Sequence, residues 1–220
     1  MVTKSALSQA RKQLSHTAFI NLNRHAVDAY YAAHPELKTW HGFRLCAIDG
    51  SQFRVPDEPD SVEAFGVNPG QDNQKECPLA LVSVYYDVLN HIGIDSSINH
   101  TAASERDCAA AHLNYAHPND LSILDRSYNA FWLYALYEAT GRYFCRRAKI
   151  NQGPFYKQLA GSGKAQAVVT LEPNPRSVEQ CWEKGLPTRP LRLCLIRVEQ
   201  EDGEVEVLIT HLMNEQAFSP

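Results

Sequence analysis

The chain has 220 residues, of which 44% are hydrophobic and 21% charged, a balance typical of a globular protein with a substantial core. No stretch approaches the ~18 apolar residues of a membrane-spanning helix, and the amino terminus lacks the apolar centre of a signal peptide. We therefore expect a cytoplasmic protein that contacts no membrane. The six cysteines are widely scattered and show no metal-binding spacing.

The formal net charge of −4 argues mildly against a nucleic-acid partner, but the basic residues are unevenly distributed. Between Ala139 and Leu171 the chain has no acidic residue and six basic ones. Such segregation can produce an anion-binding face on an acidic protein. A solvated charged surface is the alternative explanation for any single run of charges.

The first half of the chain predicts two helices followed by strands. Residues 5–33 have helical periodicity that is interrupted at 15–17, and Pro35 ends the pattern. Residues 56–76 are rich in Pro, Gly, Asn and Asp and predict a long exposed loop. The predicted strands are 43–49, 51–55, 79–88 and 91–98.

The second half alternates helices and strands and then becomes rich in strands. We predict a helix at 104–115, a strand at 121–125, an aromatic-rich helix at 129–140 and a strand at 142–147. After Gly153 the predicted strands are 165–171, 191–199 and 204–213, with a short helix at 178–184. The order is βββαβαβ followed by an antiparallel β segment.

Two aspartates follow apolar runs in this pattern. Asp49 comes after residues 43–48, and Asp125 comes after residues 121–124. Carboxylates at strand ends face the crevice where open α/β sheets bind ligands, and a pair of them could hold divalent metal ions. The alternatives are that Asp49-Gly50 forms a hairpin turn and that Asp125 caps a helix.

The sequence does not match other common catalytic motifs. Residues 161–164 (Gly-Ser-Gly-Lys) lack the first glycine of a phosphate-binding loop and the Ser or Thr after its lysine. The sequence contains no Gly-x-Ser-x-Gly and no His-Glu-x-x-His. The nine histidines form no metal motif, and His112 and His117 are expected to have surface or capping roles. The strand-end carboxylate pair is the remaining candidate.

Several segments together resemble one known family. They are 44–51 (Arg-Leu-Cys-Ala-Ile-Asp-Gly-Ser), 55–57 (Val-Pro-Asp), 65–66 (Phe-Gly), 104–107 (Ser-Glu-Arg-Asp), 121–128 (ending Leu-Asp-Arg-Ser-Tyr), 143–149 (Tyr-Phe-Cys-Arg-Arg-Ala-Lys) and the opening 6–11. In this order they resemble the DDE transposases of bacterial insertion sequences, specifically the insertion-sequence-four family. The resemblance implies an α/β fold: an RNase H-like mixed five-stranded sheet flanked by helices, with a β-rich insertion after the fifth strand.

The same resemblance implies four segments and a set of roles. The segments are an N-terminal helical part (1–40), a partial RNase H-like catalytic core (41–152), the β-rich insertion (153–213) and a short tail (214–220). Asp49 and Asp125 would bind Mg²⁺ or Mn²⁺ and serve DNA strand cleavage and strand transfer. The partners would be DNA, namely transposon ends and target, and a second copy of the chain, in a nucleoid-associated cytoplasmic protein. The residues that would contact DNA phosphates are Arg126, Arg146, Arg147 and Lys149.

One part of the family pattern is missing. The family's third carboxylate is a Glu on a helix after the insertion, whereas Glu215 stands in a different context near the end of this chain. We therefore expect an incomplete catalytic core, with reduced metal binding and doubtful activity on its own. A catalytically inactive DNA-binding remnant is the second hypothesis. An unrelated α/β domain, with Asp49 and Asp125 as turn residues, is the third.

Overall fold

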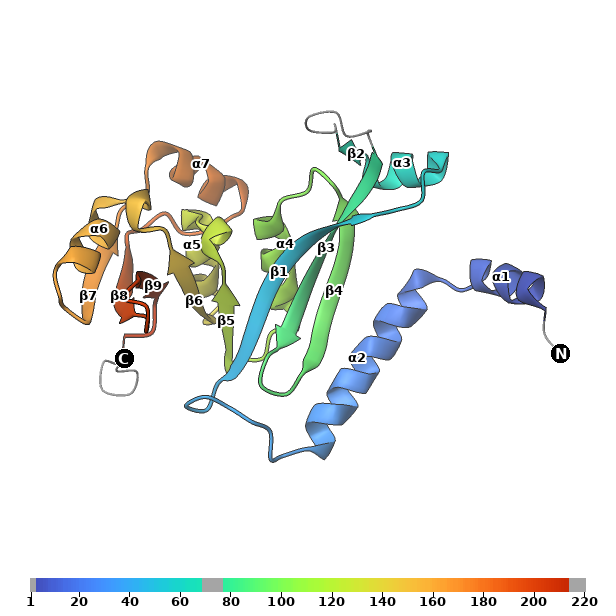
Figure 1. The fold of residues 1–220 in the computed structure, drawn as a ribbon, viewed down its shortest axis with the longest axis horizontal. Coiled ribbons are helices and arrows are strands. Elements are labelled where there is room, and N and C mark those ends of the chain that lie inside the picture. Colours follow the sequence, from blue (N-terminus) through green and yellow to red (C-terminus); the bar gives the residue numbers. More distant parts are fainter. Residues whose placement is uncertain (1–2, 69–76, 214–220) are drawn as a thin grey trace.

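The computed structural model describes residues 3–68 and 77–213, and most of these belong to one sheet with its flanking helices (Figure 1). The helices are α1 (Lys4–Lys12), α2 (His16–Ala33), α3 (Pro59–Phe65), α4 (Glu105–His112), α5 (Phe131–Ala139), α6 (Pro154–Gly161) and α7 (Pro175–Glu183), with short 3-10 turns η1 (Leu113–Tyr115), η2 (Arg126–Tyr128) and η3 (Ile150–Gln152). The strands are β1 (Arg44–Arg54), β2 (Val67–Asn68), β3 (Cys77–Asp87), β4 (Ile92–His100), β5 (Asp120–Leu124), β6 (Tyr143–Ala148), β7 (Gln166–Leu171), β8 (Leu191–Glu199) and β9 (Val205–Thr210).

Five strands form the centre of the sheet in the order β4-β3-β1-β5-β6. β1, β5 and β6 run parallel, and β3 and β4 are antiparallel additions at the other side of β1. Helices α4 and α5 lie behind this sheet in Figure 1, and the aromatic side chains of α5 are buried against it. This mixed five-stranded arrangement confirms the expected RNase H-like fold class.

The β-rich segment extends the same sheet. β9 pairs antiparallel with β6, from Cys145↔Thr210 to Ala148↔Val207, and β8 and β7 follow. On its other side β9 pairs with β8, and Leu195, Val207 and Ile209 are buried in the common core. The segment after β6 is therefore continuous with the central sheet by backbone hydrogen bonds, while the boundary proposed at 152/153 stays a prediction.

β1 is longer than the sequence predicted. It runs without interruption through Asp49 and Gly50, and its second half, Ser51–Arg54, pairs antiparallel with Val82–Leu79 of β3. The interpretation of Asp49-Gly50 as a hairpin turn is therefore wrong. The predicted loop at 56–76 also contains regular structure, because Pro59 begins α3 and β2 follows; residues 69–76 lie outside the described part.

The two amino-terminal helices agree with the prediction, and the side chain of Ser15 caps α2 by accepting from the Thr17 N–H. α2 contacts β4, where the Asn23 side chain donates to the Ile94 carbonyl over 3.0 Å. Its Tyr31 hydroxyl donates to Asp87 of β3 over 2.9 Å. Among the helices of the described ranges, none combines the length and apolar character needed to cross a membrane.

Candidate active site

The two aspartates of the predicted site lie on neighbouring parallel strands. The pairing of β1 with β5 ends at Ala47↔Ile123, so Asp49 and Asp125 each stand two residues past the last pair. Beyond that level β5 has ended, while β1 continues as a partner of β3. Both aspartates are exposed. Because β1 and β5 are parallel and in this register, both aspartates lie at the same edge of the sheet.

The backbone after β5 orients Asp125. Its Oδ1 accepts the Ser127 N–H at 2.7 Å and lies 2.6 Å from the Ser127 hydroxyl oxygen, as in an Asx turn. Asp125 thereby caps the 3-10 turn η2, which agrees with the capping role considered as the alternative. The capping role uses only Oδ1, and no partner for Oδ2 is found in the described part of the chain. Capping and ligand binding are therefore compatible.

A third carboxylate, from Glu105 at the start of α4, approaches the same turn. Its Oε2 accepts from the Ser127 hydroxyl at 3.2 Å, so Ser127 lies between Glu105 and Asp125. Glu105 packs over Gly50, where an added Cβ would lie only 3.0 Å from the Glu105 Cγ. No local pattern in the sequence indicates a role for Glu105, although the Ser104-Glu105-Arg106-Asp107 segment is one of the resembling motifs.

Tyr128 is a buried tyrosine whose hydroxyl is influenced by all three acids. Tyr128 is fully buried at the end of η2, and its hydroxyl has no hydrogen-bond partner among the described residues. The pKa of this phenol is raised, first by burial and then by the negative charges of Glu105, Asp49 and Asp125. A buried hydroxyl without a partner is rare in proteins and is usually satisfied by water or a bound group. The negative charges of all three carboxylates thus act on this one buried phenol.

The donor set fits a hard divalent cation only in part. Carboxylate oxygens are the ligands that Mg²⁺ and Mn²⁺ prefer, and both aspartates have oxygens without a partner among the described residues. However, no group of three or more Asp, Glu, His or Cys side chains converges as a metal site within residues 3–68 and 77–213. Strand alternation explains this, since Asp49 projects from the sheet face opposite to Gly50 and Glu105.

Three of the four predicted DNA-contacting residues reach the surface beside this edge. Arg126 follows Asp125 directly, Arg147 lies near the end of β6, and Lys149 comes just after that strand. The Arg126 and Arg147 side chains are 42% and 44% exposed, and both form ion pairs with Glu206 of β9. Lys149 is also exposed. The parallel pairing of β5 with β6 brings these cations together.

Arg146 differs from the other three because it is fully buried. Its Nη1 donates to the carbonyls of Arg126 at 3.4 Å and Arg147 at 3.0 Å, and its guanidinium lies over the Tyr134 ring. The structure therefore places Arg146 where no DNA phosphate can reach it, contrary to its expected contact. Its position fits a structural role, connecting the turn after β5 to the end of β6.

A second polar cluster lies inside the core. His112 of α4 is 1% exposed, with Nε2 3.0 Å from the Ser83 hydroxyl and Nδ1 2.7 Å from Asp95. The surface or capping role expected for His112 is therefore wrong. Although a Ser-His-Asp arrangement can activate a nucleophile, Ser83 is fully buried and inaccessible to a substrate. These hydrogen bonds satisfy polar groups beneath α4.

Sequence comparison connects the chain to the transposases of insertion sequences, which confirms the resemblance derived from its motifs. One relative is the transposase InsG for insertion sequence element IS4 of Escherichia coli strain K12, 24% identical over 80% of this chain and 40% of InsG. Another is the putative transposase InsZ of the same strain, 28% identical over 57% of this chain and 42% of InsZ. The chain thus spans about two fifths of the length of each relative.

No protein-family profile matches the chain. Among solved structures, it is similar to a piggyBac transposase in a synaptic complex with hairpin DNA, with 10% sequence identity and a TM-score of 0.39. That similarity covers 79% of this chain and 35% of the other.

Proposed function

We propose that the chain forms part of the catalytic region of a DNA transposase, with Asp49 and Asp125 as ligands of Mg²⁺ or Mn²⁺. The observation that carries the proposal is their common level on the parallel strands β1 and β5, in a chain whose relatives are transposases. When bound, a divalent ion at such carboxylates supplies Lewis-acid stabilisation of the charge that develops on phosphate oxygens.

The side chains around the two aspartates have separate tasks in this proposal. Asp125 is oriented by Ser127, which leaves its Oδ2 available to a ligand. Glu105 is a candidate for a third oxygen donor, and a change of its rotamer is required because it approaches from the other sheet face. Arg126, Arg147 and Lys149 bind the DNA backbone and hold it beside the carboxylates.

The test is cleavage of DNA by the purified chain in the presence of Mn²⁺. Asp49→Asn and Asp125→Asn should each abolish cleavage, because each removes a negatively charged ligand while keeping the side-chain size. Asp28→Asn is the matched control, since Asp28 is an exposed aspartate on α2. Cleavage that survives both active-site substitutions would overturn the catalytic assignment.

The second hypothesis, a DNA-binding chain without catalysis, is favoured by one specific observation. The three carboxylates do not converge within the described residues, so a complete metal site requires rearrangement or a further ligand. Such a chain would bind DNA through the exposed cations, and Asp49→Asn or Asp125→Asn would leave that binding unchanged or stronger. Cleavage by the unaltered chain, lost in both variants, would exclude this hypothesis.

A further inference from the structure

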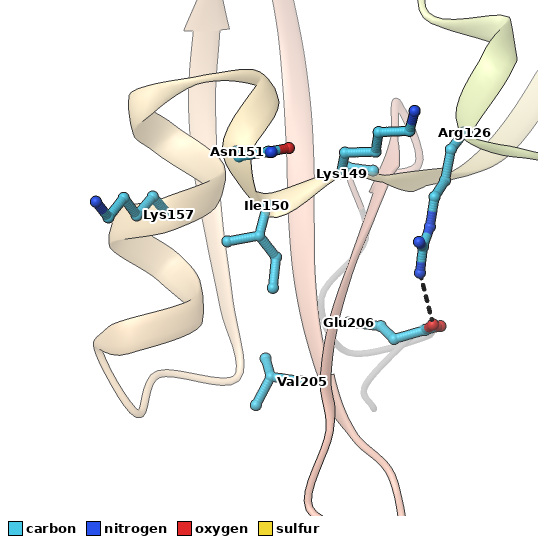
Figure 2. Close-up of a pocket in the computed structure, with 8 residues that line it drawn as sticks. Arg126, Lys149, Ile150, Asn151, Lys157, Val205 and Glu206 are labelled. Atoms are coloured by element: carbon cyan, nitrogen blue, oxygen red, sulfur yellow. Dashed lines mark hydrogen bonds and ion pairs between the residues drawn. The ribbon is translucent and has the colours of Figure 1, made fainter.

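A cavity of about 450 Å³ lies next to the candidate metal site, between the turn after β5, the end of β6, α6 and β9 (Figure 2). Arg126, Lys149, Asn151 and Lys157 line it together with Glu206. These residues come from segments up to 80 positions apart in the chain. The β-rich segment therefore contributes to the same surface as the residue that follows Asp125.

Glu206 is bound by two arginines at the edge of this cavity. Arg126 donates from Nη2 to Glu206 Oε1 at 3.3 Å, and Arg147 pairs with the same oxygen. In Figure 2 the Arg126 side chain extends toward the carboxylate. Planar guanidinium groups recognise carboxylates and phosphates through the same geometry. The Glu206 carboxylate therefore occupies a position suited to any oxyanion.

The positive charge around Glu206 exceeds what one carboxylate neutralises. The ammonium groups of Lys149 and Lys157 point away from Glu206 in Figure 2, and no ion pair to either is found among the described residues. Arg126 also has a buried Nε without a hydrogen-bond partner in the described part of the chain. Because this Nε is closed off from solvent, the groups that can meet an anion in the cavity are the Arg126 Nη atoms and the two lysines.

We propose that this cavity binds a phosphodiester group of the DNA backbone, and that Glu206 holds the place of that phosphate in the free chain. The proposal deepens the proposed function and rests on it, because DNA is the polyanion concerned. Binding exchanges one oxyanion for another at Arg126 and Arg147, while Lys149 and Lys157 turn toward the phosphate. Glu206 is then a built-in competitor that limits the affinity of this surface for DNA.

The test measures binding of fluorescently labelled duplex DNA to the full chain over a series of salt concentrations. Each phosphate contact contributes about 0.9 to the slope of log affinity against log salt. Lys149→Gln and Lys157→Gln should each weaken binding and reduce the slope by about 0.9. Glu206→Gln should tighten binding several-fold at low salt and make the slope steeper, because it releases two arginines.

Exposed residues far along the chain from the cavity provide matched controls. Lys38→Gln and Glu36→Gln, in the segment between α2 and β1, make the same charge changes as the test variants. The proposal is overturned if Glu206→Gln binds no tighter than Glu36→Gln, or if the lysine variants lose no more than Lys38→Gln. Circular dichroism of every variant establishes that it is folded.

The two proposals fail in different ways. If the test variants and their controls show the same salt dependence of DNA affinity, while cleavage is intact and depends on Asp49, only the phosphate-site proposal is overturned. If the chain does not cleave DNA but the test variants still differ from their controls in the salt dependence of binding, the catalytic assignment is overturned and the phosphate site stands. An unaltered chain that binds no DNA at low salt would overturn both.

Discussion

Asp49 and Asp125 lie at the same level of two adjacent parallel strands, each two residues past the pair Ala47↔Ile123. This relationship joins residues far apart in the sequence, and it depends only on the register of β1 with β5. Since the β5 chain turns away at Asp125, the level just beyond the pairing is open to ligands.

Divalent metal should stabilise the folded chain. A ligand at one hundred times its dissociation constant adds about 2.7 kcal/mol to the free energy of unfolding. For a chain of this size that corresponds to a rise of roughly 5–10 °C in the midpoint of thermal unfolding. Differential scanning fluorimetry with Mn²⁺ should show this rise, and Asp49→Asn should lose it while Asp28→Asn keeps it. An equal rise in Asp49→Asn would exclude a site at this residue.

Glu105 should contribute to metal affinity. Glu105→Gln keeps a group that can accept from Ser127 but removes the charge, so Mn²⁺ affinity measured by calorimetry should fall about tenfold or more. Gly50→Ala should act in the same direction, because its Cβ would press on the Glu105 side chain. Gly93→Ala is the control, since nothing lies within 4 Å of a Cβ added there. Unchanged affinity in Glu105→Gln would assign Glu105 to the support of the turn only.

The opposite end of β5 should control stability. Asp120 is 2% exposed and accepts two hydrogen bonds from Arg44, at 2.6 and 2.9 Å, and one from the Tyr85 hydroxyl at 2.8 Å. Asp120→Asn leaves the mostly buried guanidinium without its counter-charge and should cost about 3 kcal/mol of unfolding free energy. Urea denaturation measures this loss. A cost below about 0.5 kcal/mol, the range of ordinary surface changes, would contradict it.

His211 should make stability depend on pH. Its ring stacks with those of Tyr143 and Phe144, and burial lowers the pKa of its imidazole below the usual value. Above the unfolded-state pKa of about 6.5 both states are neutral, and below it the unfolded state binds the proton more readily. The free energy of unfolding should therefore fall as pH decreases from about 7 to 5. His211→Phe keeps the stacking and should show a smaller fall; an identical fall in both proteins would rule out His211.

Local patterns predicted most of the central sheet but not its full extent. β3, β4, β5 and β6 are strongly apolar or alternating, and each was predicted close to its observed bounds. β1 was divided in two because Asp-Gly is a strong turn signal, whereas pairing with β3 holds both residues extended. The helix α6 was missed, although Pro154 stands at its first position.

The sequence predicted that Asp49 and Asp125 lie on neighbouring strands, but it predicted the side chains around them less well. The buried position of Arg146 could have been found, since Phe144, Arg146 and Ala148 alternate on one buried face of β6. The positions of Glu105 and Glu206 beside the candidate site could not, because they depend on the packing of α4 over Gly50 and on the pairing of β9 with β6. Such long-range contacts leave no local pattern in the sequence.

The pairing of β9 with β6 has a mechanical consequence. Backbone hydrogen bonds join the β-rich segment to the central strands over Cys145–Ala148, so the segment cannot hinge as a rigid unit without breaking them. Appended domains commonly move on flexible linkers, whereas this segment is a rigid extension of the central sheet. The distance between Glu206 and the carboxylates of the candidate site is therefore set by folding, before any ligand binds.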